Sequence, residues 1–267
     1  MKLSIFTTGT NPISRGDLFD EPLACYNDLA DEVVYVDGSG DLPDGQHADV
    51  CYKWPDEFDW PFIGEQFQRG YEVCTGDWVI HADLDFIFHE TTFGDIRQRL
   101  ERCEAPAMSF LKWQFILPDR YNLKSRLVIA VNKKKYGDRI RFDSGGDLCQ
   151  PSLDGKYLSP DDVPEIKIPF YNYEKIKKTK EQVSDDVGRM ERAYLRHFGH
   201  TQYGDGNDAL TNWHEAQKGK LLKPQQKILL EEHPIYIREV IKNLKPDQFG
   251  YDGWGIEGNS YAQNSSR

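Results

Sequence analysis

The chain has 267 residues, a formal net charge of −11 and a pI near 5.1. This acidic composition argues against binding to nucleic acids or anionic membranes, because both need a basic face. The five cysteines are an odd number without a CxxC pair, which argues against a disulfide or zinc framework and favours a reducing cytoplasm. The first residues, MKLSIFTTG, are too few for a transmembrane span and lack a small-residue cleavage site, so we expect a soluble protein.

The N-terminal part of the chain alternates between predicted strands and helices. These are a strand over 2–9, a helix near 17–30, a strand over 32–41 that breaks at Asp37-Gly38, a short strand near 50–53, a helix from Pro61 to Gly76 and a strand over 78–88. The segment before Asp37 is almost entirely β-branched or aromatic, as in a strand buried in a parallel sheet. This βαβ order predicts an α/β fold with a mostly parallel sheet, in which ligands bind at the carboxyl ends of the strands.

The second half of the chain has a less regular pattern. It predicts a helix around 91–102, strands near 106–117, 126–132 and 167–173, and a long charged helix over 174–197 with a solvated face. The segment from Pro246 is rich in Gly, Asn and Ser, which favours a loosely ordered tail. We therefore expect one domain over 1–245, with helices at its C-terminal end, and a flexible tail over 246–267.

Two aspartates, Asp83 and Asp85, interrupt the apolar run DWVIHADLDFIFHE (77–90). Burying an unpaired carboxylate costs several kcal/mol, so a positive partner is expected at the end of this strand, and a metal ion is the candidate. Because strand side chains alternate, both aspartates would point to the same side. The alternatives are that the pair caps the next helix or forms surface ion pairs.

Two longer segments resemble one enzyme family. The run LADEVVYVDGSGD from Leu29 is similar to the segment of family-2-like glycosyltransferases in which a strand ends in an Asp, Gly and Ser that hold the donor's nucleoside. The run FIGEQFQRGYEVCTGDWVIHADLDFI is similar to the helix, Gly-Asp turn and Asp-x-Asp strand of the same enzymes. The resemblance implies a GT-A fold, which is a Rossmann-like sheet flanked by helices with a helical C-terminal extension. Residues 1–104 would be its nucleotide-sugar half and 105–245 its acceptor half.

The resemblance also implies an activity and a donor site. The enzyme would move a sugar from a nucleoside-diphosphate sugar to a hydroxyl acceptor such as a glycan, and carboxylate-bound Mn²⁺ or Mg²⁺ would neutralise the leaving diphosphate. Asp83 would face the ribose and the metal, while Asp85 would bind the metal more directly. The nucleoside site would comprise Asp37 and Ser39, with Thr7 and Thr8 lining the base pocket. Asp37 is also an ordinary turn residue beside Gly38, and threonines at a strand end are common.

A third metal ligand and a catalytic base are harder to place. Related enzymes often take a late His from a strand end before a Lys-rich helix, and KIPFYNYEKIKKTKEQ resembles that passage with Asn172 in the place of the His. An Asn oxygen suits Mn²⁺ or Mg²⁺, and His197 and His200 are the competing ligands. For the base that deprotonates the acceptor, the turn FDSGGDL suggests Asp147, with Asp143 behind it, although the usual Glu-Asp pair is absent.

Other interpretations remain open. Trp113, Phe115 and Tyr121 would stack on a sugar acceptor or, as their spacing more often indicates, belong to the core. A haloacid-dehalogenase-type phosphatase also has an Asp-x-Asp strand, but Phe86-Ile87 lacks its Thr or Val two places after the second Asp. A non-catalytic sugar-binding domain is a further alternative. A nucleotidyltransferase would need a Gly-rich, Lys- or Arg-bearing loop after the first strand, which we do not expect here. The nucleoside, the sugar, the acceptor, the stereochemical outcome and the oligomeric state are not specified by the sequence.

Overall fold

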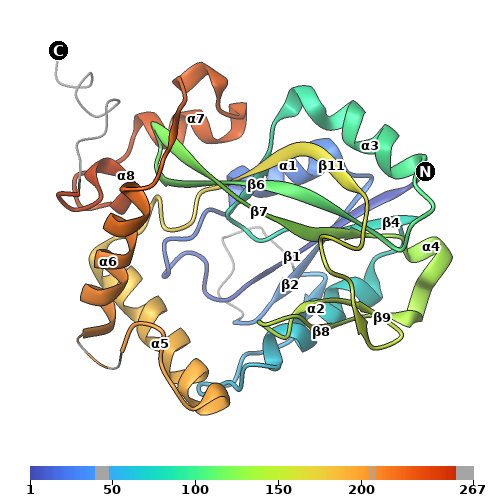
Figure 1. Cartoon of the computed structure of the whole chain (residues 1–267), viewed down its shortest axis with the longest axis horizontal. Helices are drawn as coiled ribbons and strands as arrows, with labels where there is room; N and C mark the ends of the chain where they lie inside the picture. Colours follow the sequence, from blue (N-terminus) through green and yellow to red (C-terminus); the bar gives the residue numbers. More distant parts are fainter. Residues whose placement is uncertain (40–47, 205, 207, 257–267) are drawn as a thin grey trace.

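The computed structural model describes residues 1–39, 48–204, 206 and 208–256. Within these residues, nine strands form one mixed sheet in the order β3-β2-β1-β4-β7-β6-β11-β5, with β12 on β7 (Figure 1). The strands are β1 (Leu3–Gly9), β2 (Glu32–Asp37), β3 (Val50–Cys51), β4 (Trp78–His81), β5 (Phe86–Phe88), β6 (Ala107–Leu117), β7 (Arg120–Val131), β11 (Glu165–Asn172) and β12 (Gln226–Lys227). A smaller sheet contains β8 (Ile140–Ser144), β9 (Gln150–Leu153) and β10 (Lys156–Tyr157).

Helices cover both faces of the large sheet. They are α1 (Asp20–Leu29), α2 (Phe62–Val73), α3 (Phe93–Glu101), α4 (Lys133–Tyr136), α5 (Lys180–Phe198), α6 (Asp208–Leu221), α7 (Ile235–Lys242) and α8 (Phe249–Asp252), with short 3-10 turns η1 (Glu90–Thr92), η2 (Gly137–Arg139) and η3 (Leu230–Glu232). The predicted α/β architecture is confirmed. No helix in the described part of the chain is long and apolar enough to cross a membrane.

The sheet direction changes at its middle. Strands β3, β2, β1 and β4 are parallel, and in this register Gly9 lies opposite Asp37. Strand β7 is antiparallel to β4, β6 is antiparallel to β7, and β11 then runs parallel to β6. The carboxyl ends of β1, β2 and β4 therefore meet at one edge, which is where the sequence predicts ligand binding.

Alternating side chains of β1 build the two halves of the core. Leu3 and Ile5 belong to the cluster under α1, α3 and α7, whereas Phe6 belongs to the cluster under α2 and the smaller sheet (Figure 1). All three are fully buried. This alternation of apolar side chains on both faces is what a central strand of a covered sheet requires.

The predicted strand over 78–88 is wrong, because the chain divides there into two strands. Strand β4 ends at His81, and β5 starts at Phe86 on the far edge of the sheet beside β11. Asp83 and Asp85 lie in the turn between them, where the Phe86 amide donates to the Asp83 carbonyl at 2.9 Å. The Tyr26 hydroxyl lies 2.5 and 2.7 Å from the Asp83 and Phe86 carbonyl oxygens and fixes this crossing.

Two other boundaries differ from the predictions. The predicted helix over 174–197 begins only at Lys180, because Lys175 has a left-handed backbone and Thr179 caps the helix with Gln182. The predicted loose tail from Pro246 is instead ordered as far as Ile256, where Phe249 of α8 is buried against Trp213. The rest of that predicted tail, 257–267, lies outside the described residues.

Candidate active site

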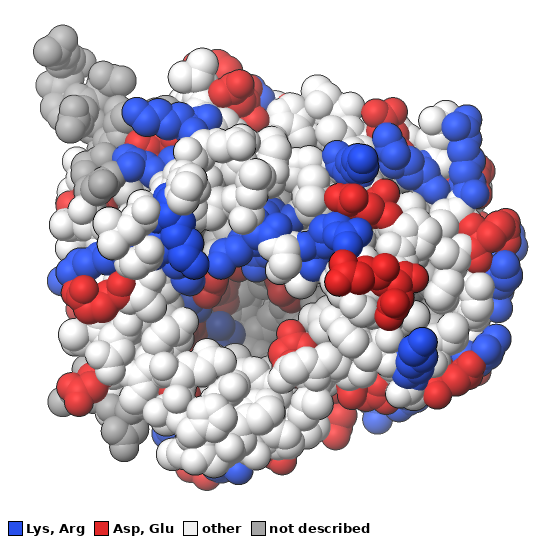
Figure 2. Space-filling view, viewed as in Figure 1, with Lys and Arg blue, Asp and Glu red and all other residues white. Residues whose placement is uncertain are grey.

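A cavity of about 530 Å³ opens at the carboxyl edge of the large sheet, and Figure 2 shows this face hollowed at its centre. The loops that follow β1, β4, β8 and β11 supply most of its walls. Predicted site residues come together here from distant parts of the sequence, namely Thr8, Asp83, Asp85, Asp147 and Asn172. We refer to this cavity as the cleft.

The predicted metal ligands lie at the junction of β5 and β11. Asn172 pairs with Phe86 in the antiparallel register, and the next amide, of Tyr173, donates to the Asp85 carbonyl at 2.8 Å. This pairing brings Asn172 beside Asp85. The Asp85 Oδ1 and Asn172 Oδ1 atoms are both buried and have no hydrogen-bond partner among the described residues. Because buried acceptors normally have a donor or an ion, these two oxygens, which come from neighbouring residues of one cleft, are suited to a bound cation.

The two aspartates differ in their surroundings. Burial, followed by the charges of Asp83 and Glu174, raises the pKa of Asp85 to about 7. Burial also acts on Asp83, but the nearby His81 outweighs it and holds the pKa of Asp83 below its usual value. The His81 Nε2 lies 3.1 Å from Asp83 Oδ1, and the Asp83 side chain is 44% exposed. Burial and the neighbouring acids therefore disfavour the charged form of Asp85, and a bound cation would favour it.

These oxygens suit a hard divalent cation. Mg²⁺ and Mn²⁺ prefer carboxylate and amide oxygens, and an ion would satisfy the buried atoms of Asp85 and Asn172. Among the described residues, no three His, Cys, Asp or Glu side chains are grouped as a metal site. An all-protein site of three ligands would thus need the Asn172 amide oxygen in addition to Asp83 and Asp85.

The competing histidines lie outside the cleft. His197, in the last turn of α5, has its Nδ1 3.1 Å from Asp59 Oδ1. His200 has its Nδ1 3.1 Å from the Phe198 carbonyl oxygen. Neither lines the cleft. Of the three candidate third ligands, Asn172 is the one that the structure places beside Asp85.

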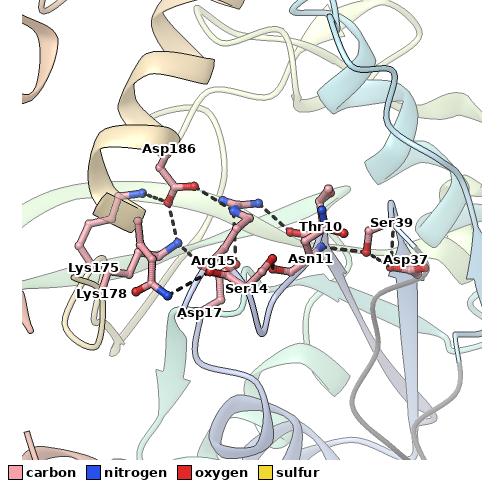
Figure 3. Close-up of polar contacts among 11 residues, drawn as sticks. Thr10, Asn11, Ser14, Arg15, Asp17, Asp37, Ser39, Lys175, Lys178 and Asp186 are labelled. Carbon is pink, nitrogen blue, oxygen red and sulfur yellow. Dashed lines mark hydrogen bonds and ion pairs between the residues drawn. The ribbon is translucent and has the colours of Figure 1, made fainter. Parts of the chain in front are cut away.

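The predicted nucleoside residues lie at the ends of β1 and β2. Asp37 is 2% exposed, and its Oδ1 accepts hydrogen bonds from the Ser39 amide at 3.0 Å and hydroxyl at 2.9 Å. The Asn11 amide donates to Ser39 Oγ at 2.8 Å, which ties this turn to the loop after β1 (Figure 3). Neither Asp37 nor Ser39 lines the cleft itself. Their role in nucleoside binding stays a prediction, beside a turn role that the structure shows directly.

Strand alternation separates the two threonines. Thr8 lines the cleft, whereas Thr7 is fully buried and its Oγ1 has no partner among the described residues. Gly38 is needed nearby, because a Cβ at this position would overlap the Trp54 ring and Thr10 Oγ1. Trp54 also lines the cleft. The absence of a side chain at Gly38 therefore leaves room for the Trp54 ring in the wall of the cleft.

The turn after β8 carries the candidate base. The Trp60 indole donates to the Asp147 carbonyl at 2.8 Å, and Gln150 donates to Asp147 Oδ2 at 3.2 Å. Asp147 Oδ1 is buried without a partner among the described residues, which leaves one oxygen able to accept a proton in the cleft. Asp143 is exposed on β8, lies outside the cleft and accepts a bond from Ser152 Oγ at 2.6 Å.

The three aromatic residues proposed for acceptor stacking pack together instead. Trp113 stacks on Tyr121 with ring centroids 4.2 Å apart, and Phe115 lies 5.4 Å from Tyr121. None of them lines the cleft. The core interpretation of these residues is therefore the one that the structure supports.

An ion network that the sequence analysis missed borders the cleft (Figure 3). Asp186 of α5 is bound by Arg15 Nε at 2.9 Å, Lys175 Nζ at 2.8 Å and Lys178 Nζ at 2.6 Å. Lys178 also contacts Asp17 at 2.5 Å and is only 4% exposed. These lysines therefore do not belong to a solvated helix face, and the loop after the first strand does carry an arginine. Its signal was visible in the segment GTNPISRGD, which directly follows β1.

Two further cations line the cleft without an ion pair among the described residues. Arg189 lies over the Trp54 ring at 5.3 Å and the Phe58 ring at 5.9 Å. Burial, followed by the charge of Arg15, lowers its pKa to about 10, so it remains charged at neutral pH. Lys112 of β6 lies 5.6 Å above the Phe86 ring. Both side chains are available to bind an anion in the cleft.

Comparison with solved structures finds a resemblance to TarS of S. aureus. The structure of TarS 1-349 aligns with 81% of this chain and 79% of that chain at 12% identity and a TM-score of 0.41. The structure of TarS 1-349 in complex with UDP aligns with 74% of this chain and 66% of that chain, at 11% identity and a TM-score of 0.40. The structure of TarS aligns with 90% of this chain and 50% of that chain, at 10% identity and a TM-score of 0.37. No family model and no curated protein matches the chain. At such low TM-scores the likeness carries no argument about activity.

Proposed function

We propose that this protein is a GT-A glycosyltransferase that moves a sugar from a nucleoside-diphosphate sugar to a hydroxyl acceptor. The observation that carries the proposal is the pair of buried oxygens, Asp85 Oδ1 and Asn172 Oδ1, which lack a partner among the described residues at the carboxyl edge of the sheet. They lie in a cleft whose volume, about 530 Å³, suits a small-molecule ligand. A site with carboxylates and cations in one cleft suits a donor that carries both a metal and a diphosphate.

The residues divide the chemistry between them. Asp83, Asp85 and Asn172 would hold Mn²⁺ or Mg²⁺, which when bound neutralises charge on the leaving diphosphate as a Lewis acid. Arg189 and Lys112, which both line the cleft, add positive charge and lower the cost of placing an anion there. Asp147, with its partnerless Oδ1, would accept the proton of the acceptor hydroxyl. Asp37, Ser39, Thr7 and Thr8 remain the proposed nucleoside contacts.

Alternative activities fit the structure less well. In a haloacid-dehalogenase-type phosphatase, a Thr or Val would stand two residues after the second aspartate. Here Phe86 and Ile87 occupy β5 and are buried in the core. A non-catalytic sugar-binding domain would not need a partnerless Asp147 oxygen in the cleft, but it remains a possible outcome of the experiment below.

The test uses a panel of sugar nucleotides with Mn²⁺, with Mg²⁺ and with EDTA. Thermal shift reports donor binding, and release of nucleoside diphosphate reports turnover. Asp85→Asn should keep the fold and lose both the metal-dependent shift and the turnover, whereas the control Asp95→Asn, on the exposed side of α3, should lose neither. Unchanged turnover in Asp85→Asn would refute the metal-dependent mechanism. Sugar binding without nucleotide release would favour a binding domain, and hydrolysis of p-nitrophenyl phosphate would favour a phosphatase.

A further inference from the structure

Four lysines that form no ion pair with a carboxylate of the described residues gather beside the cleft, and we refer to them as the lysine rim: Lys112, Lys124, Lys220 and Lys223. Lys112 of β6 lies directly opposite Lys124 of β7 in the antiparallel register. Like charges placed directly opposite each other destabilise a sheet. Among the described residues, Glu174 is the acid whose charge acts on Lys112, Lys124 and Lys220, and it forms no ion pair with any of them. This arrangement is unusual in a chain whose net charge is −11.

The end of α6 adds the other two lysines. Lys220 is half-buried, and its Nζ donates to Gln217 Oε1 at 2.9 Å, while Lys223 is exposed just beyond the helix. Burial lowers the pKa of Lys124, and Lys223 and Lys112 lower it further. The side chains are therefore close enough to repel each other. One acid, Glu174, offsets part of the charge of these four lysines, so the fold keeps a surplus of positive charge at this place.

The lysine rim is continuous with the cleft. Lys112 lines the cleft, and Lys220 lines a second cavity of about 200 Å³ that shares Trp60, Glu174 and Lys175 with it. Figure 2 shows a band of Lys and Arg side chains along one border of the hollow. All four lysines lie within 105–245, the predicted acceptor half, whereas Asp83 and Asp85 lie before it. A ligand bound at the rim would reach the cleft from the side opposite the predicted nucleoside residues.

We propose that the lysine rim binds an acceptor that carries phosphate or carboxylate groups close to the hydroxyl to be glycosylated. This inference rests on the proposed glycosyltransferase function and names its acceptor class. An anionic acceptor supplies the counter-charge that Glu174 alone does not, and it does so only when bound, so the rim favours acidic over neutral acceptors. The acidic remainder of the surface repels the same acceptor elsewhere and directs it to the rim.

The experiment compares acceptors that differ in charge alone: glycerol with glycerol 3-phosphate, and glucose with glucose 6-phosphate and glucuronate. The measured quantity is nucleoside diphosphate release above acceptor-free donor hydrolysis. The double variant Lys124→Gln/Lys223→Gln is paired with Lys167→Gln/Lys245→Gln, which removes the same charge from two exposed lysines without ion pairs in the described structure. We expect the rim variant to lose about tenfold in kcat/KM for acidic acceptors, with donor hydrolysis unchanged, and the control to lose none. Added salt should lower the wild-type rate with acidic acceptors.

Four results would overturn the proposal. Neutral acceptors as effective as acidic ones, or a rim variant equal to its control, would exclude a role in acceptor binding. Equal loss of donor hydrolysis would place the lysines at the donor instead. Leu123 and Leu222 are exposed beside the rim, at 61% and 89%, so binding to phosphatidylglycerol vesicles that the rim variant alone loses, without an acceptor effect, would identify a membrane contact.

Failure of the proposed glycosyltransferase function is distinguishable from failure of the lysine-rim proposal. In the first case the wild-type protein turns over none of the sugar nucleotides. In that case the lysine rim is tested by binding of dextran sulfate against neutral dextran. Binding of dextran sulfate that weakens in the rim variant and not in its control would support an anion-binding surface. Equal binding of both polymers, or of both variants, would refute it.

Discussion

Two carboxylates near the cleft have opposite environments. Asp186 is 3% exposed and is surrounded by three cations, Arg15, Lys175 and Lys178, which together outweigh its burial and hold its pKa far below the usual value. Asp85 is also surrounded by protein, but its burial, followed by the charges of Asp83 and Glu174, outweighs the charges of Lys112 and Lys175 and raises its pKa to about 7. One acid is therefore neutralised by the chain itself, and the other is not.

The difference separates a structural carboxylate from a binding one. A buried charge with internal partners ties elements together, as Asp186 of α5 does for the loop after β1 (Figure 3). A carboxylate that the fold leaves without a cation stabilises nothing until a cation arrives. The folding free energy and the activity should therefore respond in opposite ways when each acid is neutralised.

Neutralising Asp186 should have the largest effect on stability. Asp186→Ala leaves three cations close together without their common partner, and breaking a buried ion pair of this kind costs about 3–5 kcal/mol. Urea denaturation measures the loss in the free energy of unfolding. The control Asp185→Ala, one residue earlier on the exposed side of α5, should change it little. A loss below about 1 kcal/mol in Asp186→Ala would contradict the structural role.

Neutralising Asp85 should cost activity but not stability. In metal-free buffer, Asp85→Asn removes repulsion from Asp83 and Glu174, so the free energy of unfolding should stay unchanged or rise. Turnover of the donor should fall by roughly 10²–10³, or about 3–4 kcal/mol of transition-state stabilisation. The two quantities are measured by urea denaturation and by nucleoside diphosphate release. If the Asp85→Asn variant is destabilised but active, Asp85 has a structural role like that of Asp186 and is not the binding carboxylate.

Asp147 offers a narrower test of the catalytic assignment. If Asp147 is the base, Asp147→Asn should lower the transfer rate by roughly 10² while donor affinity barely changes. Asp143→Asn is the matched control, because Asp143 lies on the adjacent strand but faces away from the cleft. Steady-state rates and donor titrations separate the two effects. An equal loss of donor affinity would make Asp147 a donor-site or structural residue.

The sequence predicts the first half of the fold well because its signals are local. Periodic apolar residues and the Asp37-Gly38 break define β1, α1, β2 and α2 within a few residues. The same reasoning fails at 82–85, where two apolar segments look like one strand. Their division depends on the Tyr26 hydroxyl and on pairing with β11, which are contacts over long sequence separations. Such contacts leave no periodic signal in the segment itself.

The site was predictable where its residues follow strands. Asp83, Asp85 and Asn172 are found in the cleft because they lie at the carboxyl ends of β4 and β11 in the large sheet, whereas Asp147 reaches it from the turn between β8 and β9 of the smaller antiparallel sheet. Arg15 and Lys178 were missed for a different reason. The partner of Arg15, Asp186, lies more than a hundred residues away in the sequence, so no local pattern reveals the pair. Lys178 belongs to a lysine-rich segment, and the composition of such a segment is the same whether its lysines are solvated or bound to Asp186.

His233 is a third buried ionisable group, and unlike Asp186 and Asp85 it is a base. His233 is fully buried, its Nδ1 lies 2.7 Å from the Tyr173 hydroxyl, and burial lowers its pKa to about 4. The unfolded chain, where a histidine titrates near 6.5, therefore binds the proton more tightly than the folded protein does. The contribution to stability is complete above pH 6.5 and is lost as the pH falls through that value toward 4.

Between pH 7 and pH 5 this linkage amounts to about 2 kcal/mol of unfolding free energy. His233→Gln removes the titrating group and should flatten that part of the stability profile, even though the variant is less stable at pH 7 through lost packing against Phe115. His200→Gln, which changes an exposed histidine, should leave the profile as in the wild type. Urea denaturation at half-unit pH steps measures the three curves. If the wild-type and His233→Gln profiles run parallel, His233 is not the group responsible, and other groups account for any loss of stability in acid.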